Sequence, residues 1–316
     1  MSNFDVNNLF KVDGLVAVIT GGGSGIGRVI ARALVTNGAK RVYILGRRIG
    51  ALEETASPHP ETIIPILADV TEAASLTDAA QRIREEVGYV DFLVAGAGMV
   101  YFGPRPASTA TPTGDEAGGP GIKHPPTGGT PTVGRRLAPN ATAAEVQSYL
   151  LATTPDEFLT TYRVNTMGVF YTLAAFISLL DAGNKKRSTS QTQTQTSHVV
   201  AIASVAGQNR NATGGCAYGM SKAAVIQLMG QMNRVLAPLG IRGNTLSPGY
   251  FPSELAGGPT NYDITKEGTF PMELIPLTRS GTDEEMAGTI LYLASKAGGY
   301  VNGHVLVVDG GNLGYR

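Results

Sequence analysis

The chain has 316 residues and no net formal charge, with 25 Lys and Arg against 25 Asp and Glu. This balance gives no electrostatic basis for nucleic acid or an anionic membrane as the main partner, so we expect a small-molecule substrate instead. The single cysteine, Cys216, excludes an internal disulfide and fits a reducing compartment, so the expected location is cytoplasmic.

The N-terminal residues 1–14 lack the basic and then apolar pattern of a signal peptide. The longest apolar run, residues 164–180, is interrupted by polar residues and glycine. No segment that spans a bilayer is therefore expected.

Short runs of β-branched and apolar residues alternate with stretches of helical periodicity. We predict strands at residues 15–20, 41–45, 62–68, 92–95, 198–204, 241–247 and 304–308. Nearly continuous apolar strands separated by helices are typical of a parallel sheet covered on both faces. The sequence therefore predicts a doubly wound α/β fold, with residues 1–316 in a single domain.

Two polar stretches interrupt this alternation, but the strand and helix pattern resumes after each of them. Residues 103–140 hold eight Gly and eight Pro in 38 positions, with too few aliphatic side chains to offset the chain entropy. This Pro-, Gly- and Thr-rich surface insertion is either a lid over the active site or a segment without a function of its own. Residues 185–197, with a Gln-Thr repeat, are expected to lengthen a loop.

The segment TGGGSGIG at residues 20–27 follows the first strand and begins a helix predicted at 26–35. In this setting Gly21 allows a tight turn, Gly25 lets backbone amides approach a pyrophosphate, and Gly27 lets the helix pack closely on the strand. A flexible turn is the alternative for a glycine pattern alone. The strand, turn and helix context favours a dinucleotide-binding loop.

The end of the second predicted strand indicates which dinucleotide is bound. NAD enzymes usually place an acidic residue there for the ribose 2′-hydroxyl, whereas this chain has Arg47 and Arg48 and no acid before Glu53. Guanidinium groups bind a 2′-phosphate in a bidentate manner. The pair favours NADP(H), the alternative being two solvated loop residues.

Tyr218 and Lys222 lie four residues apart at the start of an apolar helical pattern that ends near Val235, so both face one side of the helix. A phenol with a pKa of about 10 is a poor base at neutral pH, and a nearby ammonium lowers that pKa. An exposed Tyr and Lys with no shared function is the alternative at this common spacing.

Two further polar residues make that alternative less attractive. Ser204 ends a strand 14 residues before Tyr218, where it can polarise a carbonyl oxygen. Asn165 lies in a helix that begins with the capping signal of residues 154–157, at a point where a helical bend could hold a water for proton relay. A polar residue with no function is the alternative for Asn165.

These motifs together resemble the short-chain dehydrogenase/reductase family in its compact, Rossmann-type branch. The resemblance runs from Leu15 to Gly311 apart from the two insertions, and also includes the 247–249 Ser-Pro-Gly turn. It implies hydride transfer between the nicotinamide and a carbonyl, a secondary alcohol or a related C=N or C=C group. It also implies a catalytic tetrad in which Tyr218 is the general acid/base, Lys222 binds the nicotinamide ribose and tunes Tyr218, Ser204 orients the substrate oxygen, and Asn165 supports the relay.

The same resemblance implies a set of residues that contact the cofactor. Asp69 and Val70 would border the adenine, and Phe251 and Ser253 would meet the carboxamide. The expected cofactor-binding residues are Gly21, Gly23, Ser24, Gly25, Ile26, Gly27, Arg47, Arg48, Asp69, Val70, Ala95, Gly96, Ala97, Tyr218, Lys222, Pro248, Gly249, Phe251 and Ser253.

One segment departs from the family pattern. The family usually has Asn-Asn-Ala-Gly after the fourth strand, where this chain has Ala95-Gly96-Ala97-Gly98. The first Asn and its side-chain hydrogen bonds are therefore missing, which weakens strand support or cofactor affinity. A non-catalytic NADP-binding scaffold or regulator is thus an alternative, as is an NADP-dependent epimerase or dehydratase that shares the Tyr-Lys pair.

The segment at 250–276 covers the substrate in such proteins, and its apolar residues predict a lipophilic pocket for a mid-sized metabolite of secondary metabolism; ordinary loop packing is the alternative. These residues are Phe251, Leu255, Tyr262, Phe270, Met272, Leu274 and Ile275.

The resemblance also suggests a homotetramer or dimer, built by the helices of Asn165 and Lys222 and the strand at 304–308. No metal site is expected, because the four histidines lack ligand spacing.

Overall fold

The seven predicted strands all form, and they make one parallel sheet in the order β3-β2-β1-β4-β5-β6-β7. The computed structural model describes residues 4–100, 140–188, 195–210, 215–254, 263 and 266–314. The order of the strands reverses between β1 and β4, which confirms the doubly wound fold. The strands are β1 Val16–Thr20, β2 Arg41–Gly46, β3 Ile63–Leu67, β4 Phe92–Ala95, β5 His198–Ile202, β6 Arg242–Pro248 and β7 Val305–Val308.

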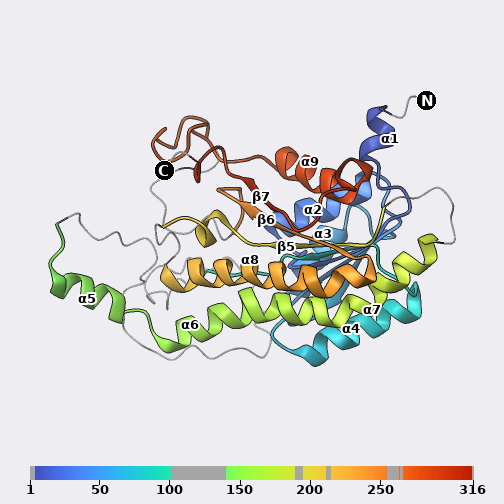
Figure 1. The fold of residues 1–316 in the computed structure, drawn as a ribbon, viewed down its shortest axis with the longest axis horizontal. Coiled ribbons are helices and arrows are strands. Elements are labelled where there is room, and N and C mark those ends of the chain that lie inside the picture. The colour runs from blue at the N-terminus through green and yellow to red at the C-terminus, as the bar shows by residue number, and fades with distance from the viewer. Residues whose placement is uncertain are drawn as a thin grey trace.

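Helices cover both faces of the sheet (Figure 1). One face carries α2 (Gly25–Thr36), α3 (Ile49–Ala56) and α9 (Asp283–Ala294), with the short α1 (Val6–Phe10) beside α9. The other face carries α4 (Ala73–Glu86), α7 (Gly168–Ser188) and α8 (Cys216–Leu236). The sheet is thus the middle of three layers, as its apolar strands require.

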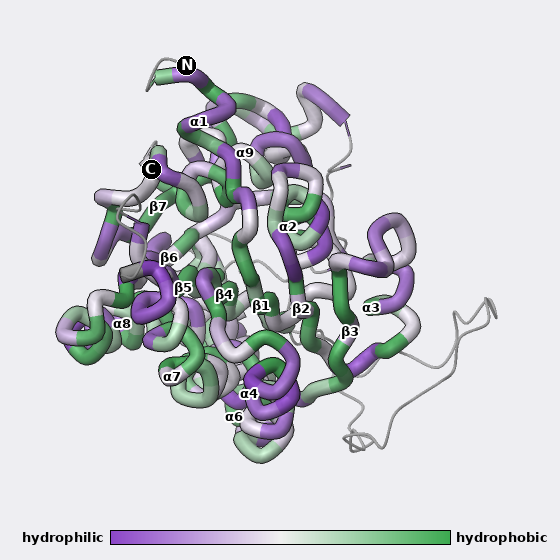
Figure 2. The backbone as a smooth tube through the Cα atoms, turned by 90° about the vertical axis from the view of Figure 1, so that its right-hand side faces the viewer, coloured by the Kyte–Doolittle hydropathy of each residue, from purple (hydrophilic) through white to green (hydrophobic). Residues whose placement is uncertain are grey.

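Each face of the sheet has its own hydrophobic core, and alternate residues of a strand enter different cores. In β1, Val16 and Val18 pack with the layer of α4, α7 and α8, whereas Ala17 and Ile19 pack with that of α2, α3 and α9. Figure 2 shows the central strands as apolar along most of their length. This explains why their sequences read as continuous apolar runs rather than alternating ones.

A long helical path leads from α6 (Pro155–Tyr162) through a π-helical segment (Arg163–Met167) into α7. Within the described residues, the 155–187 stretch is the one helix long and apolar enough to cross a membrane by length and composition. Its residues Phe176, Leu179 and Leu180 are fully buried against the sheet. The apolar composition is therefore that of a core helix.

Most of the predicted 103–140 insertion lies outside the described residues, as do residues 189–194 of the second polar stretch. The ends of that second stretch are fixed on the body: Arg187 pairs with Asp91, and the Ser197 hydroxyl donates to the Leu180 carbonyl over 2.8 Å. A helix that was not predicted, α5 (Ala143–Leu151), follows the first insertion. Its capping box of Thr142 and Glu145 is a signal readable in the sequence.

Two helical glycines give a matched test of this packing. A Cβ on Gly183 of α7 would lie 2.4 Å from the Val90 carbonyl oxygen, whereas a Cβ on the exposed Gly288 of α9 meets no atom within 4 Å. Gly183→Ala should lower the free energy of unfolding by about 1–3 kcal/mol through overpacking. Gly288→Ala should raise it by roughly 0.5–1 kcal/mol, because alanine favours the helix. Urea unfolding of both variants measures the change in the free energy of unfolding. A Gly183→Ala protein as stable as the parent would contradict the close approach of Gly183 to the Val90 carbonyl.

Candidate active site

The predicted site residues converge at one edge of the sheet. Strands β1, β4, β5 and β6 are parallel, so their carboxyl ends meet there, next to the point where the strand order reverses. The glycine-rich loop follows β1, the 95–98 segment follows β4, Ser204 follows β5 and the Pro248-Gly249 turn ends β6. The sheet thus gathers segments that are far apart in the sequence.

The glycine-rich loop turns where its glycines are needed. Gly21 and Gly25 have φ of +75° and +50°, in the left-handed region that favours glycine. A Cβ on Gly27 would lie 2.2 Å from the Gly21 carbonyl oxygen, and one on Gly21 would lie 2.9 Å from the backbone of Ala97. The tight turn at Gly21 and the close packing at Gly27 agree with the predicted geometry. The loop brings glycine backbone to the amino end of α2, which fits a pyrophosphate.

Two residues that the sequence motifs do not indicate, Arg28 and Thr55, hold this loop in place. The Arg28 guanidinium donates to the Gly23 carbonyl (2.9 Å), to the Thr55 hydroxyl (3.2 Å) and to the Glu54 carboxylate (2.8 Å). The Thr55 hydroxyl also donates to the Gly23 carbonyl over 3.1 Å. These bonds tie the Gly23 carbonyl toward α3. A cation one turn into the helix was the available signal in the sequence.

Arg47 and Arg48 follow β2, and Arg48 contacts the glycine-rich loop. The Arg47 guanidinium lies 3.9 Å from the Asp69 carboxylate, and Arg48 donates to the Ser24 hydroxyl over 3.1 Å. Arg48 also pairs with Glu254 over 2.7 Å. Both arginine side chains are more than half exposed, at 55% and 62%. They are thus accessible cations beside the phosphate cradle.

The segment that departs from the family pattern is held by Thr20. The Thr20 hydroxyl accepts from the backbone N–H of Gly96 (3.1 Å) and of Ala97 (3.3 Å) and donates to the Val94 carbonyl (3.5 Å). A Cβ on Gly96 would lie 2.9 Å from the Thr20 carbonyl oxygen. Backbone bonds to Thr20 therefore support this strand end without an asparagine.

Tyr218 and Lys222 lie one turn apart on α8, as predicted from their spacing. Lys222 is buried, and its ammonium donates to the carbonyl of Ile202, the last residue of β5, over 2.9 Å. The Lys222 nitrogen is 5.9 Å from the centre of the Tyr218 ring. A Cβ on Gly98 would lie 3.2 Å from that nitrogen, so the small residue after β4 makes room for the ammonium.

Ser204 lies beside the Tyr218 phenol, and the two side chains are hydrogen-bonded. Ser204 caps a short 3-10 segment (Val205–Gly207), where its hydroxyl oxygen accepts from the Ala206 N–H over 3.1 Å. Because that bond uses the oxygen as an acceptor, the hydroxyl hydrogen can be donated to a neighbouring oxygen. Ser204 can therefore donate to an oxygen that lies between it and Tyr218.

The pKa of the Tyr218 phenol differs from the value predicted from its spacing to Lys222. Burial raises the pKa of the Tyr218 phenol, and the hydrogen bond with Ser204 lowers it by less. Burial also lowers the pKa of Lys222 to about 8. The prediction of a lowered phenol pKa is therefore wrong for the protein alone, because burial is the largest effect on Tyr218 and raises its pKa.

Asn165 lies in the π-helical segment, so the predicted irregularity in the helix is present. The side chain is fully buried: its oxygen accepts from the Met99 N–H (2.8 Å), and its amide donates to the Met99 carbonyl (2.9 Å) and the Ser221 hydroxyl (3.0 Å). Ser221, which was not predicted as a site residue, in turn donates to the Tyr218 carbonyl over 2.7 Å. Asn165 thus ties the segment after β4 to the turn of α8 that carries Tyr218 and Lys222.

Two expected cofactor residues, Val70 and Phe251, point their side chains elsewhere. Val70 is buried, and its Cγ2 atom lies 2.8 Å from the position that a Cβ on Gly168 would take. The Phe251 ring packs against Gly281 in the core. Any contact of Val70 or Phe251 with a cofactor would thus be through the backbone. Ser253, by contrast, approaches the glycine-rich loop, with its Cβ 2.9 Å from the position of a Cβ on Gly25.

The described part of the 250–276 segment forms a small core of its own. Phe270, Leu274 and Ile275 are buried, and the Tyr250 ring lies 5.1 Å from that of Phe270. Met272 is exposed, while Leu255 and Tyr262 lie outside the described residues. For the buried residues the structure shows ordinary loop packing, the alternative to pocket lining.

Family models match both halves of the chain. A model described as short chain dehydrogenase matches residues 15–113, and one described as Enoyl-(Acyl carrier protein) reductase matches residues 137–312. The second match alone spans more than half of the chain.

Individual proteins give the same result over nearly the whole length. The short-chain dehydrogenase/reductase PhomF of Diaporthe leptostromiformis is 37% identical over 309 residues, covering 97% of this chain and 94% of PhomF. Versicolorin reductase stcU of Emericella nidulans is 27% identical, covering 96% and 97%. Among solved structures, the Pseudomonas aeruginosa RhlG/NADP active-site complex has a TM-score of 0.71 and 27% identity, covering 96% and 98%. The chain therefore belongs to the short-chain dehydrogenase/reductase family and is an oxidoreductase.

Proposed function

We propose that this protein transfers hydride between NADP(H) and a carbonyl or secondary alcohol of a mid-sized lipophilic metabolite. The observation that carries the proposal is the meeting of Tyr218, Ser204 and the buried ammonium of Lys222 at the edge of the sheet that bears the glycine-rich loop. A proton donor, a hydrogen-bond donor and a cation beside a dinucleotide cradle suit carbonyl reduction.

The residues present fit a nicotinamide dinucleotide. The glycine-rich loop offers backbone N–H groups and the amino end of α2 to the pyrophosphate, and the exposed Arg47 and Arg48 stand beside it. The bound cofactor supplies the hydride. Residues from Ala95 to Ala97 would border the adenosine, and the backbone from Pro248 to Ser253 would meet the nicotinamide end.

Tyr218 serves as the acid in the reductive direction. Burial raises the pKa of its phenol, so the hydroxyl keeps its proton at neutral pH and can give it to the oxygen of the substrate. Ser204 holds that oxygen by donating its own hydroxyl hydrogen. In the reverse direction the phenol oxygen takes the proton back.

Lys222 and Asn165 support this proton transfer in different ways. The Lys222 ammonium, with a pKa of about 8, is mostly charged at neutral pH and stabilises negative charge that develops on the phenol oxygen. It would also bind the ribose of the cofactor. Asn165 is a positioning residue, because its side chain is engaged by Met99 and Ser221.

Two features of the chain and one related structure support NADP(H) over NAD(H). Strand β2 ends in Gly46 followed by two arginines, so the strand end itself carries no acidic residue of the kind that binds a ribose 2′-hydroxyl in NAD enzymes. Arg48 already holds an anionic group, the carboxylate of Glu254, through two guanidinium nitrogens. The related RhlG structure is named as a complex with NADP.

The substrate class and location follow from composition. We assign a lipophilic substrate because the segment that covers the site is rich in large apolar side chains, of which Met272 stays exposed while Phe270, Leu274 and Ile275 pack within the loop. Ring-containing metabolites of secondary metabolism fit this description. We also propose a cytoplasmic location, which the single cysteine supports.

Replacing Tyr218 with Phe tests the catalytic role. The variant should bind NADPH as the parent does and lose ketone reduction by about 10²- to 10⁴-fold, because only the acidic hydroxyl is removed. NADPH oxidation with a panel of ketones and fluorescence titration of NADPH measure the two effects. Tyr171→Phe on α7 is the matched control. Unchanged reduction in Tyr218→Phe, or binding of NADPH by the parent without consumption, would exclude the proposed chemistry, the second result pointing to a regulator.

Replacing Arg47 with Asp tests the choice of cofactor. The substitution exchanges a phosphate ligand for a carboxylate, so the KM for NADPH should rise roughly 10- to 100-fold and that for NADH far less. Steady-state kinetics with both cofactors give the ratio, and Arg82→Asp on the exposed face of α4 is the control for charge. Equal changes for the two cofactors would show that Arg47 does not read the 2′-phosphate.

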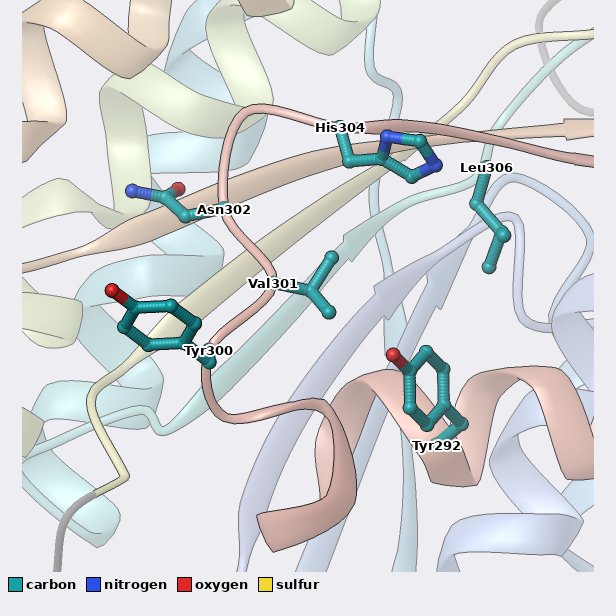
Figure 3. Close-up of a pocket in the computed structure, with 6 residues that line it drawn as sticks. All are labelled: Tyr292, Tyr300, Val301, Asn302, His304 and Leu306. Carbon is teal, nitrogen blue, oxygen red and sulfur yellow. The ribbon is translucent and has the colours of Figure 1, made fainter.

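We also propose that the protein is a homotetramer or dimer. Strand β7 is an edge strand of the sheet, and beside it Tyr292, Tyr300, Val301, Asn302, His304 and Leu306 surround a cavity of about 360 Å³ (Figure 3). Tyr300 is fully exposed. The outer side of α6, α7 and α8 also exposes large apolar residues: Leu159, Phe170 and Met220, with Met167 of the π-helical segment. Both surfaces suit burial against another copy of the chain.

Phe170→Asp tests the helical surface. A charge there should lower the mass measured by light scattering toward that of the monomer, because an unpaired carboxylate would be buried in the interface. Leu67→Asp, at an exposed position of β3 outside both surfaces, should leave the mass unchanged. A parent protein that is already monomeric at micromolar concentration would refute the assembly.

A further inference from the structure

Arg48 is engaged by a carboxylate from a distant part of the chain. Its guanidinium donates through two nitrogens to the two oxygens of Glu254, over 2.7 and 3.2 Å, and through one of them to the Ser24 hydroxyl over 3.1 Å. Ser24 is also hydrogen-bonded to Glu254. These three residues, which we name the Glu254 triad, join the loop after β1, the loop after β2 and the turn after β6.

The turn that carries Glu254 lies directly against the glycine-rich loop. The Ser253 Cβ is 2.9 Å from the position of a Cβ on Gly25, the first residue of α2. The carboxylate of Glu254 thus stands beside the amino end of a helix and between cations, since Arg28 also contributes to its electrostatic environment. Hydrogen bonding by Arg48 and these charges lower the pKa of Glu254. The carboxylate is therefore a firmly ionised anion in a place suited to anions.

The groups that hold this anion are those proposed to bind the cofactor. Arg48 and Ser24 are both expected contacts of NADP(H), and Glu254 already occupies the Nη1 and Nη2 edge of the Arg48 guanidinium, which could otherwise bind a phosphate in a bidentate manner. A 2′-phosphate at Arg48 would also lie beside the Glu254 carboxylate and be repelled by it. The carboxylate and the phosphate thus compete for the same donors.

We infer that Glu254 is an internal substitute for the cofactor's 2′-phosphate, which occupies Arg48 and Ser24 and is displaced when NADP(H) binds. The inference rests on the proposed NADP(H) dependence and extends it to a residue that sets cofactor affinity. Displacement also frees the turn after β6, which leads into the segment that covers the substrate. The entry of the phosphorylated cofactor is thereby coupled to that turn, whereas NADH has no phosphate to compete.

A purely structural ion pair would behave differently. Both side chains are largely exposed, at 62% and 61%, and exposed pairs contribute little to stability. Removing the charge of Glu254 should therefore leave the thermal unfolding of the protein nearly unchanged. An effect on ligand affinity that depends on the 2′-phosphate is not expected from a structural role.

The test measures the binding of two cofactor fragments by isothermal titration calorimetry. Adenosine 2′,5′-bisphosphate carries the 2′-phosphate and 5′-AMP lacks it. Glu254→Gln should tighten the Kd of the bisphosphate roughly threefold to tenfold and change that of 5′-AMP by less than about twofold. Glu53→Gln, which removes an exposed carboxylate of α3, is the matched control. In an Arg48→Ala background the effect of Glu254→Gln should disappear.

The outcomes separate this inference from the function on which it rests. A parent protein that binds both fragments equally would overturn the NADP(H) proposal and the inference together. A parent that prefers the bisphosphate, with no tightening or a loss of affinity in Glu254→Gln, would overturn the inference alone and leave the cofactor choice intact. Persistence of the full effect in the Arg48→Ala background would show that Glu254 acts by long-range charge and not by occupying Arg48.

Discussion

A buried lysine ammonium must be stabilised by nearby acceptors, and the geometry of this site follows from how Lys222 meets that need. Its nitrogen donates to the carbonyl at the end of β5, and Gly98 after β4 leaves the space it occupies. Asn165 then fixes Met99 on one side and the catalytic turn of α8, through Ser221, on the other. The ends of two strands and one helix are thereby held around a single charge, and the Tyr218 phenol is positioned by the same helix.

Much of this arrangement could be predicted from the sequence because it is local. Strands are read from apolar runs of five or six residues, the turn at Gly21 from its place between strand and helix, and the shared face of Tyr218 and Lys222 from a spacing of four. Even the irregular helix at Asn165 is signalled by the cap at Thr154 and a polar residue within an apolar pattern. The carboxyl ends of parallel strands must meet at one edge of the sheet, so the residues that follow different strands are also predicted to lie together.

The remainder could not be predicted because it depends on contacts across the fold. The pair of Arg48 and Glu254 joins residues 206 positions apart, and no periodicity links them. The direction of a side chain after a strand end is likewise decided by packing, so Phe251 enters the core although its motif suggests the cofactor. The pKa of Tyr218 depends on the balance of burial against the hydrogen bond with Ser204, and the spacing of Tyr218 and Lys222 shows neither.

The two ends of the site are built from different kinds of interaction, and this decides how each responds to change. At the nicotinamide end, buried hydrogen bonds hold Asn165 and Lys222, and breaking one leaves a polar group without a partner at a cost of about 1–3 kcal/mol. At the proposed phosphate end, Arg47 and Arg48 make exposed ion pairs with Asp69 and Glu254, which exchange at little cost. Substitutions near Lys222 should therefore remove activity outright, whereas substitutions near Arg48 shift the balance between cofactors. An enzyme of this design can change its cofactor preference without disturbing its proton-transfer group.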